Sequence, residues 1–84
     1  LYNSRLTGAN FKRANLLRAD LWGANLLGTD FHQANLKGAD MEDAENSTQD
    51  QFNWACVDST TKLPPDIKRQ ETYPGCDYWK EKEK

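Results

Sequence analysis

Few residues in this chain are of types that carry out chemistry, and they do not form a recognisable set. His32 is the single histidine, and both cysteines, Cys56 and Cys76, lie well away from it in the sequence. A nucleophile activated by histidine, or a zinc site, needs several such side chains close together. We therefore expect no catalytic centre, no metal, no cofactor and no small-molecule substrate.

Two further polar groups have a plain interpretation. The acidic residues Asp40, Glu42, Asp43 and Glu45 offer oxygen ligands, but a calcium site needs several oxygens that converge, so we interpret this group as a solvated acidic corner. The segment 46–48 matches the acceptor pattern for N-glycosylation, a short pattern that is common by chance. Both groups leave the expectation of a non-enzymatic protein unchanged.

The cysteine pair bears on the compartment in which the protein works. Cys56 and Cys76 both lie in the irregular second half of an 84-residue chain. Small domains with a limited core often contain disulfides, which persist in oxidising compartments. The pattern favours a disulfide over two free thiols, and closing a loop of about 20 residues would stabilise the fold by roughly 3 kcal/mol.

Charge and hydropathy exclude several classes of protein. The chain has 11 basic and 13 acidic residues, a formal charge of −2, and neither sign dominates either half. Nucleic-acid binding normally shows a clustered basic surface, so we expect none. No stretch approaches the roughly 20 apolar residues of a membrane span, so we expect a soluble chain.

The elements that must position all these residues are set by a repeat of five. Large apolar residues recur at every fifth place, with a small residue two places before each and mostly Asn or Asp between them. A spacing of five fits neither an α-helix nor a simple strand, so each unit contains a turn. Asn and Asp side chains form Asx turns, and glycines supply corners. The large residues are Leu1, Leu6, Phe11, Leu16, Leu21, Leu26, Phe31, Leu36 and Met41.

Matching residues at a separation of 20 predict the length of one coil. Phe11 lies 20 places before Phe31, and these are the only phenylalanines of the repeat. Leu6 and Leu26 have the same separation. Four units would then form a coil, and neighbouring coils would share backbone hydrogen bonds as a parallel ladder.

The units of residues 1–45 resemble the A-(D/N)-(L/F)-x-x motif of the pentapeptide-repeat family. The resemblance implies an all-β fold, a right-handed quadrilateral parallel β-helix, which would have about three coils here. We expect this solenoid over 1–58, regular over 1–45 and degenerate over 46–58 after one inserted residue, with units centred on Phe52 and Val57.

The remaining residues, 59–84, are expected to form an irregular and partly helical cap. Two helical turns are expected over Asp66–Thr72 and a second short helix from Asp77. Aromatic residues of the second half, Trp54 among them, would cover the end of the solenoid, because exposed edges invite aggregation. Leu1 enters in repeat phase, which indicates a product of a longer chain, and we expect the first coil to be covered by upstream sequence or another chain.

Apolar residues at outward positions form a candidate interaction surface. Leu17, Trp22 and Leu27 follow the large residue in three consecutive units, and Tyr2 lies 20 places before Trp22. Outward groups of this kind are typical of contact surfaces. The alternative is that the tail folds back on them or that they are ordinary exposed apolar residues.

We therefore predict a structural or protein-interaction scaffold, a subunit or accessory factor of a larger assembly such as a membrane-protein complex. The repeat, the segment Val57–Thr60 and the cysteine pair resemble the luminal pentapeptide proteins of cyanobacteria and chloroplasts. That resemblance implies the thylakoid lumen, or another oxidising compartment, and a role in photosynthesis. The alternative, a DNA-mimicking topoisomerase-binding protein, needs a long and densely acidic rod, whereas Lys12 and Arg13 interrupt the acidic faces of this short one.

Overall fold

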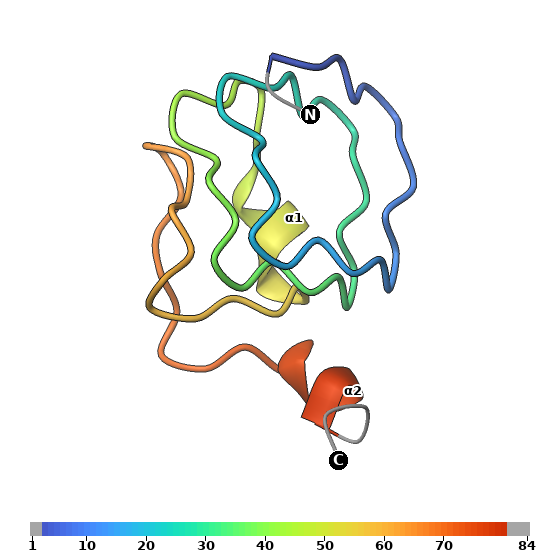
Figure 1. Ribbon diagram of the computed structural model, residues 1–84, viewed down its shortest axis with the longest axis vertical. Helices are drawn as coiled ribbons and strands as arrows, with labels where there is room; N and C mark the ends of the chain where they lie inside the picture. The colour runs from blue at the N-terminus through green and yellow to red at the C-terminus, as the bar shows by residue number, and fades with distance from the viewer. Residues whose placement is uncertain (1–2, 81–84) are drawn as a thin grey trace.

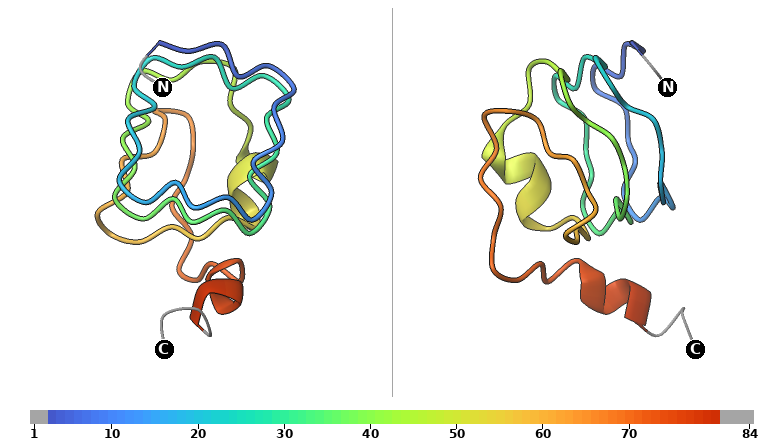
Figure 2. Two further views of the ribbon diagram at one scale, coloured as in Figure 1. Left: turned by 45° about the vertical axis from the view of Figure 1, so that its right-hand side comes forward. Right: turned by 60° about the vertical axis from the view of Figure 1, so that its left-hand side comes forward.

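The computed structural model describes residues 3–80, which wind through successive coils and end in a tail (Figure 1). Viewed along their axis, the coils lie over one another with a four-sided outline (Figure 2). Two short helices interrupt this path, α1 (Gln49–Asn53) and α2 (Cys76–Lys80). The sides of the coils meet at turns, and these turns follow directly from the repeat.

A tight turn closes each regular unit. The N–H of the small residue donates to the carbonyl of the large residue three places earlier, as from Ala14 to Phe11 at 3.0 Å. Only the third residue of the turn has a positive φ, 60° at Arg13 and 70° at Gly8, which is the pattern of a type II turn. Glycine adopts this conformation freely, whereas a residue such as Arg13 does so at a cost of about 1–2 kcal/mol.

In the regular units from Asn10 to Asp40, the Asn or Asp supports the same turn. Its Oδ1 accepts a hydrogen bond from the N–H two residues later, as from Lys12 to Asn10 at 2.9 Å and from Glu42 to Asp40 at 3.0 Å. The expected Asx turns are therefore confirmed.

Parallel backbone pairing joins residues 20 apart. Arg5 pairs with Asn25, and Asn25 pairs in turn with Glu45, so these residues lie on three successive levels. The pairs within residues 3–80 are isolated bridges and do not extend into strands, because each unit has a single bridged residue between two turns. The described residues thus show stacked coils, and the right-handed quadrilateral β-helix of an all-β protein stays a prediction.

The third coil contains two inserted residues. The bridge separation rises to 21 between Asn35 and Cys56 and to 22 between Asp40 and Lys62. The first insertion agrees with the sequence analysis, and the second was not foreseen. Its extra residue lies in the turn after Val57, before the pairing resumes at Lys62. The division of the chain at residue 58 stays a prediction, and this last bridge lies beyond it.

Helix α1 replaces one side of the third coil, where the sequence analysis expected a degenerate unit centred on Phe52. The Thr48 N–H donates to Gln51 Oε1 at 2.8 Å, as in a capping box. No backbone bridge joins α1 to the second coil within residues 3–80, so the carbonyls of that side of the second coil need another donor. Gln51 Nε2 provides it, donating to the carbonyls of Leu26 at 2.6 Å and Thr29 at 3.0 Å.

A column of phenylalanine rings runs through the core. The ring centroids of Phe11 and Phe31 are 6.0 Å apart with an interplanar angle of 11°, and those of Phe31 and Phe52 are 5.7 Å apart at 25°. Phe31 is 1% exposed, so it is enclosed between its two neighbours. This column confirms the 20-residue coil that the sequence predicts.

The first part of the tail is not helical, and its role as a cap stays a prediction. Leu63, Ile67 and Tyr73 pack against the core. The helix expected over Asp66–Thr72 is wrong, because its backbone bonds elsewhere: the Lys68 N–H donates to Gln49 Oε1 at 2.9 Å. The short helix expected from Asp77 is present as α2. Among the residues described, neither helix has the length and apolar character needed to cross a membrane.

Candidate interaction surface

The positions of the predicted surface residues follow from the four-sided outline of the coils. Leu17, Trp22 and Leu27 are each five residues apart, so they lie at three successive corners. Leu17 and Leu27 are half a coil apart and therefore lie at opposite corners. The structure does not bring the three together in one continuous patch. Tyr2, the fourth predicted member, lies outside the described residues.

Two of these residues are well exposed, and a third exposed residue was missed. Leu17 is 49% and Leu27 is 52% exposed, while Trp22 is partly buried. Trp54 is 54% exposed, although the sequence analysis assigned it to the cap. The sequence signal for an exposed Trp54 was Phe52, because the two residues that follow each large residue of the repeat lie at outward positions, and Trp54 is the second residue after Phe52.

Trp54 occupies a corner position on the third coil. Its carbonyl accepts from the Gln33 N–H at 2.7 Å, just as the carbonyl of His32 accepts from the Arg13 N–H at 2.9 Å. The rings of His32 and Trp54 are 5.9 Å apart. Beside Trp54 lies a groove bordered by Asn53, Gln70, Glu71, Thr72 and Pro74.

A hollow beside Leu17 contains Asp58, the one carboxyl group within residues 3–80 that has a clearly shifted pKa. Burial raises the pKa of Asp58, but hydrogen bonds from the hydroxyl and the N–H of Thr60, together with the charge of Lys37, lower it by more in total. The pKa of Asp58 therefore lies below its ordinary value of 3.8. The Thr60 N–H donates to Asp58 Oδ1 at 2.9 Å, which fixes the turn at this corner.

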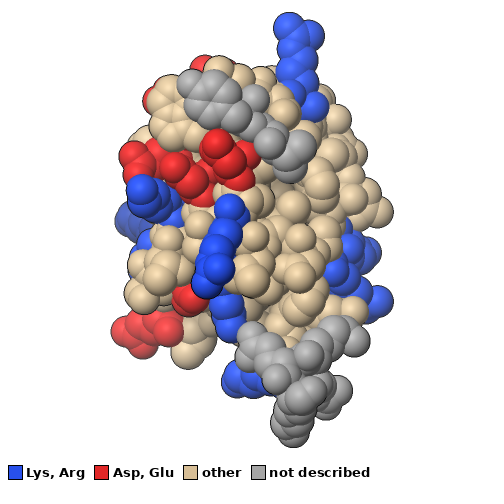
Figure 3. All heavy atoms as spheres, viewed as in Figure 1, with Lys and Arg blue, Asp and Glu red and all other residues tan. Residues whose placement is uncertain are grey.

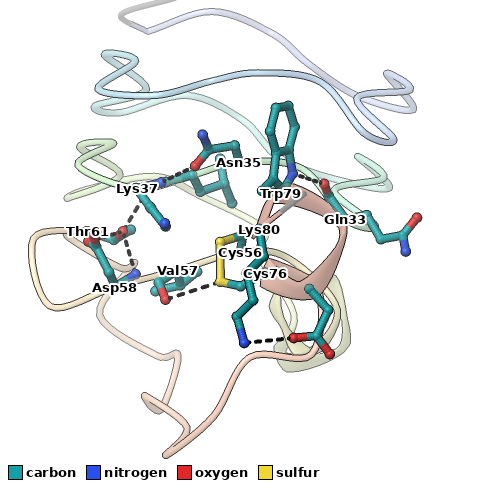
Figure 4. The surroundings of a disulfide bond; sticks show 12 residues. Gln33, Asn35, Lys37, Cys56, Val57, Asp58, Thr61, Cys76, Trp79 and Lys80 are labelled. Carbon is teal, nitrogen blue, oxygen red and sulfur yellow. Dashed lines mark hydrogen bonds and ion pairs between the residues drawn. A yellow bond between two sulfur atoms is a disulfide. The ribbon is translucent and has the colours of Figure 1, made fainter. Parts of the chain in front are cut away.

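A disulfide between Cys56 and Cys76 holds the last part of the tail against the side of the coils (Figure 4). Cys56 takes the Asn or Asp position of its unit, since it pairs with Asn35, and Cys76 begins α2. The bond is the one that the sequence favours. It ties the third coil to the helix, so α2 lies beside the coils and not over their end.

Three further contacts fix α2 in this place. Trp79 Nε1 donates to the carbonyl of Gln33 at 2.6 Å (Figure 4). The guanidinium carbon of Arg13 lies 5.5 Å from the centroid of the Tyr78 ring. Gly75 is buried so closely that a Cβ there would lie 2.0 Å from the carbonyl oxygen of Trp54. Tyr78 and Trp79 of α2 therefore pack against the coils.

Within residues 3–80 no group of three or more His, Cys, Asp or Glu side chains is placed to hold a metal ion. His32 contacts an aromatic ring, and both cysteines are bonded to each other. The candidate binding groups among the described residues are thus the exposed apolar side chains at the corners and the aromatic side chains of α2.

Comparison with known families agrees with the geometry of the coils. The family model for pentapeptide repeats matches residues 4–43 in eight copies. Residues 4–43 belong to the pentapeptide-repeat family. No curated protein and no solved structure matches the chain. The pentapeptide repeats include Leu17, Trp22 and Leu27, whereas Trp54 and the disulfide lie beyond the matched segment.

Proposed function

We propose that this protein is a non-enzymatic scaffold that binds a protein partner through side chains at the corners of its coils. The supporting observation is the exposure of Leu17 and Leu27, about half in each case, at positions that carry polar residues or glycine in most units. Membership of the pentapeptide-repeat family supports a repeat or interaction protein in general.

The frame suits this role because its corners are rigid before binding. The units of Leu17 and Leu27 are each closed by a backbone turn and an Asx bond, so a side chain at these corners has little backbone freedom to lose. Preorganisation of this kind raises affinity by lowering the entropic cost of association. Because Leu17 and Leu27 lie at opposite corners, a partner that contacts both must surround part of the coil, as in a subunit of a larger assembly.

We extend the proposal to the fold and the compartment. A coil length of 20 residues, turns at the corners and parallel bridges support a right-handed quadrilateral β-helix. The disulfide between Cys56 and Cys76 supports an oxidising compartment. The thylakoid lumen and a photosynthetic or membrane-protein complex as partner rest on the resemblance to luminal pentapeptide proteins.

The test is affinity capture of cross-linked partners from an extract of the source organism, with quantification by mass spectrometry. Burying a leucine contributes about 1.5–3 kcal/mol, so Leu17→Ser or Leu27→Ser should reduce the recovered partner about tenfold or more. Thr7→Ser is the matched control, since Thr7 lies one coil before Leu27 at the same corner. Equal recovery with all three variants would contradict the proposal.

A further inference from the structure

Trp54 is the most exposed of the large apolar residues described, at 54%, and its indole N–H is unused. Within residues 3–80 the Nε1 of Trp54 donates to no protein acceptor, whereas Trp79 Nε1 donates to the carbonyl of Gln33 at 2.6 Å. Tryptophan is enriched among the residues that dominate binding interfaces, where its ring is buried and its N–H finds a partner. The position of Trp54 therefore suits a ligand that contacts the ring.

The ring of Trp54 lies apart from the leucines of the proposed function. Trp54 occupies the same corner as His32, which comes one side of the coil after Leu27. Leu17 and Trp22 lie at the two remaining corners. The surroundings of Trp54 belong to the third coil and the tail, at the opposite end of the stack from the first coil.

A groove opens on one side of the indole. On the side of the second coil, the indole contacts the ring of His32 at a centroid distance of 5.9 Å. On the side of the tail it borders the groove described above, which has a volume of about 370 Å³. Pockets for whole small ligands have volumes of about 300–1,000 Å³, so this open groove suits a single long side chain.

The groove carries an uncompensated negative charge. Glu71 is the one charged residue among the described residues that border it. Its carboxylate is exposed and makes no ion pair or hydrogen bond within residues 3–80. The guanidinium of the nearby Arg69 is occupied elsewhere, because it donates to the carbonyls of Asp58 and Thr61 at 2.6 Å each. The charge of Glu71 is therefore available to a ligand.

The third coil adds to the negative potential around the groove. The bridges assign residues 43–63 to this coil, which has four acidic residues against one basic residue, a formal charge of −3. In Figure 3, acidic side chains gather on the left of the view with some Lys or Arg among them, and the first part of the tail, in orange, runs along this side in Figure 1. A field of one sign attracts ligands of the opposite sign, so these surroundings favour a cation.

Backbone acceptors complete the groove. Gln70 Nε2 donates to the carbonyl of Asn53 at 3.4 Å and to that of Thr72 at 3.3 Å. Both distances exceed the usual range of about 2.7–3.2 Å, and a carbonyl oxygen has two lone pairs, so both carbonyls keep the capacity to accept from a ligand. The groove thus combines an aromatic ring, a carboxylate and carbonyl oxygens.

We propose that the groove beside Trp54 binds an arginine side chain of a partner protein. A guanidinium is planar, so it stacks on an indole, and its five donors bond to a carboxylate and to carbonyls together. Tryptophan is the aromatic residue that attracts cations most strongly. Lysine has a compact charge with no plane to stack, so it fits this groove less well. The inference rests on the proposed function for the presence of a protein partner, but it uses neither of the corner leucines.

An NMR titration of the 84-residue chain tests the site. We would add a blocked Gly-Arg-Gly peptide at low salt and follow the amides of residues 70–72 and the indole N–H groups. These amides and the indole N–H of Trp54 should shift, whereas that of Trp79 should stay in place because it is bonded to Gln33. The citrulline counterpart has the same shape without the charge, so it should bind at least about threefold more weakly.

Substitutions separate the groove from the rest of the surface. Glu71→Gln and Trp54→Leu should each weaken binding of the arginine peptide about two- to fivefold. Glu45→Gln is the matched control, because it makes the same charge change elsewhere on the third coil and should leave binding unchanged. Leu17→Ser combined with Leu27→Ser should also leave it unchanged, so failure of the groove is distinguishable from failure of the corner leucines.

Several results would overturn the proposal. Equal binding of the arginine and citrulline peptides would show that the charge is not recognised. Unchanged binding with both Glu71→Gln and Trp54→Leu would place the peptide elsewhere. Shifts at residues 70–72 with phosphatidylcholine vesicles but not with the peptide would identify a lipid headgroup as the ligand, and a concentration-dependent dimer that is lost with Glu71→Gln would identify a second copy of this chain.

Discussion

Replacing Phe31 by leucine should destabilise the fold more than the same change at Phe11. Phe31 contacts a ring on each side, at centroid distances of 6.0 and 5.7 Å, whereas Phe11 has one ring neighbour within residues 3–80 and is partly exposed. An aromatic pair contributes about 0.5–1.5 kcal/mol beyond the area it buries. Phe31→Leu should therefore lower the free energy of unfolding by about 1–3 kcal/mol, and Phe11→Leu by about half as much. Leucine is the suitable replacement because it fills the same position in most other units.

Urea unfolding of the oxidised protein, followed by far-UV circular dichroism, measures both losses. The two substitutions share one ring pair, so the double variant should lose less than the sum by about 0.5–1.5 kcal/mol. Leu36→Met is the control, since a volume-conserving change at a fully buried aliphatic position should cost less than about 1.5 kcal/mol. Equal losses at Phe11 and Phe31, together with strict additivity, would refute the phenylalanine column as a source of stability.

Three further predictions concern the tail and one corner. Gly75→Ala places a Cβ 2.0 Å from the carbonyl oxygen of Trp54, so it should lower the free energy of unfolding in urea by about 1–3 kcal/mol. The control is Gly8→Ala, because Gly8 has a φ of 70° but nothing lies within 4 Å of its Cβ. A smaller loss at Gly75 than at Gly8 would contradict the packing. Cys56→Ser combined with Cys76→Ser opens a link of separation 20 and should cost about 3 kcal/mol, whereas unchanged stability would show that the disulfide does not constrain the chain. Thr60→Val removes a hydroxyl donor and should raise the pKa of Asp58 toward 3.8 in an NMR titration, whereas an unchanged pKa would refute the role of the hydroxyl. Because the pKa of Asp58 is lower in the folded state, its contribution to stability is present above pH 3.8 and is lost as the pH falls through the folded pKa.

The regular coils were predictable because each unit of five residues forms the same turn from its own residues. The separation of Phe11 and Phe31 gave the coil length, and the Asx turns followed from the chemistry of Asn and Asp. The third coil was harder to predict because its pairing is not local. Thr61 holds its unit in place by donating to the carbonyl of Leu36 at 2.8 Å, and no large residue at the expected place marks that unit in the sequence.

The helices and the surface were predictable only in part. Thr48 and Gln51 have the spacing of a capping box and could have predicted the start of α1, but the sequence analysis expected the repeat to continue there. The helix expected over 66–72 failed because Lys68 bonds to α1, a contact that a single sequence does not reveal. Exposure of Leu17 and Leu27 followed from the repeat phase, but their separation onto opposite corners follows from the four-sided coil.

A coil of four units has a consequence for how such chains can change in length. An insertion of one unit within residues 4–43 would turn everything after it by one side, and would carry α1 and the disulfide to a different face from the one that they occupy now. An insertion of four units would leave every face in place and lengthen the stack by about 4.8 Å. Duplication and deletion can therefore alter the distance between the two ends without altering their relative orientation only when they act on whole coils.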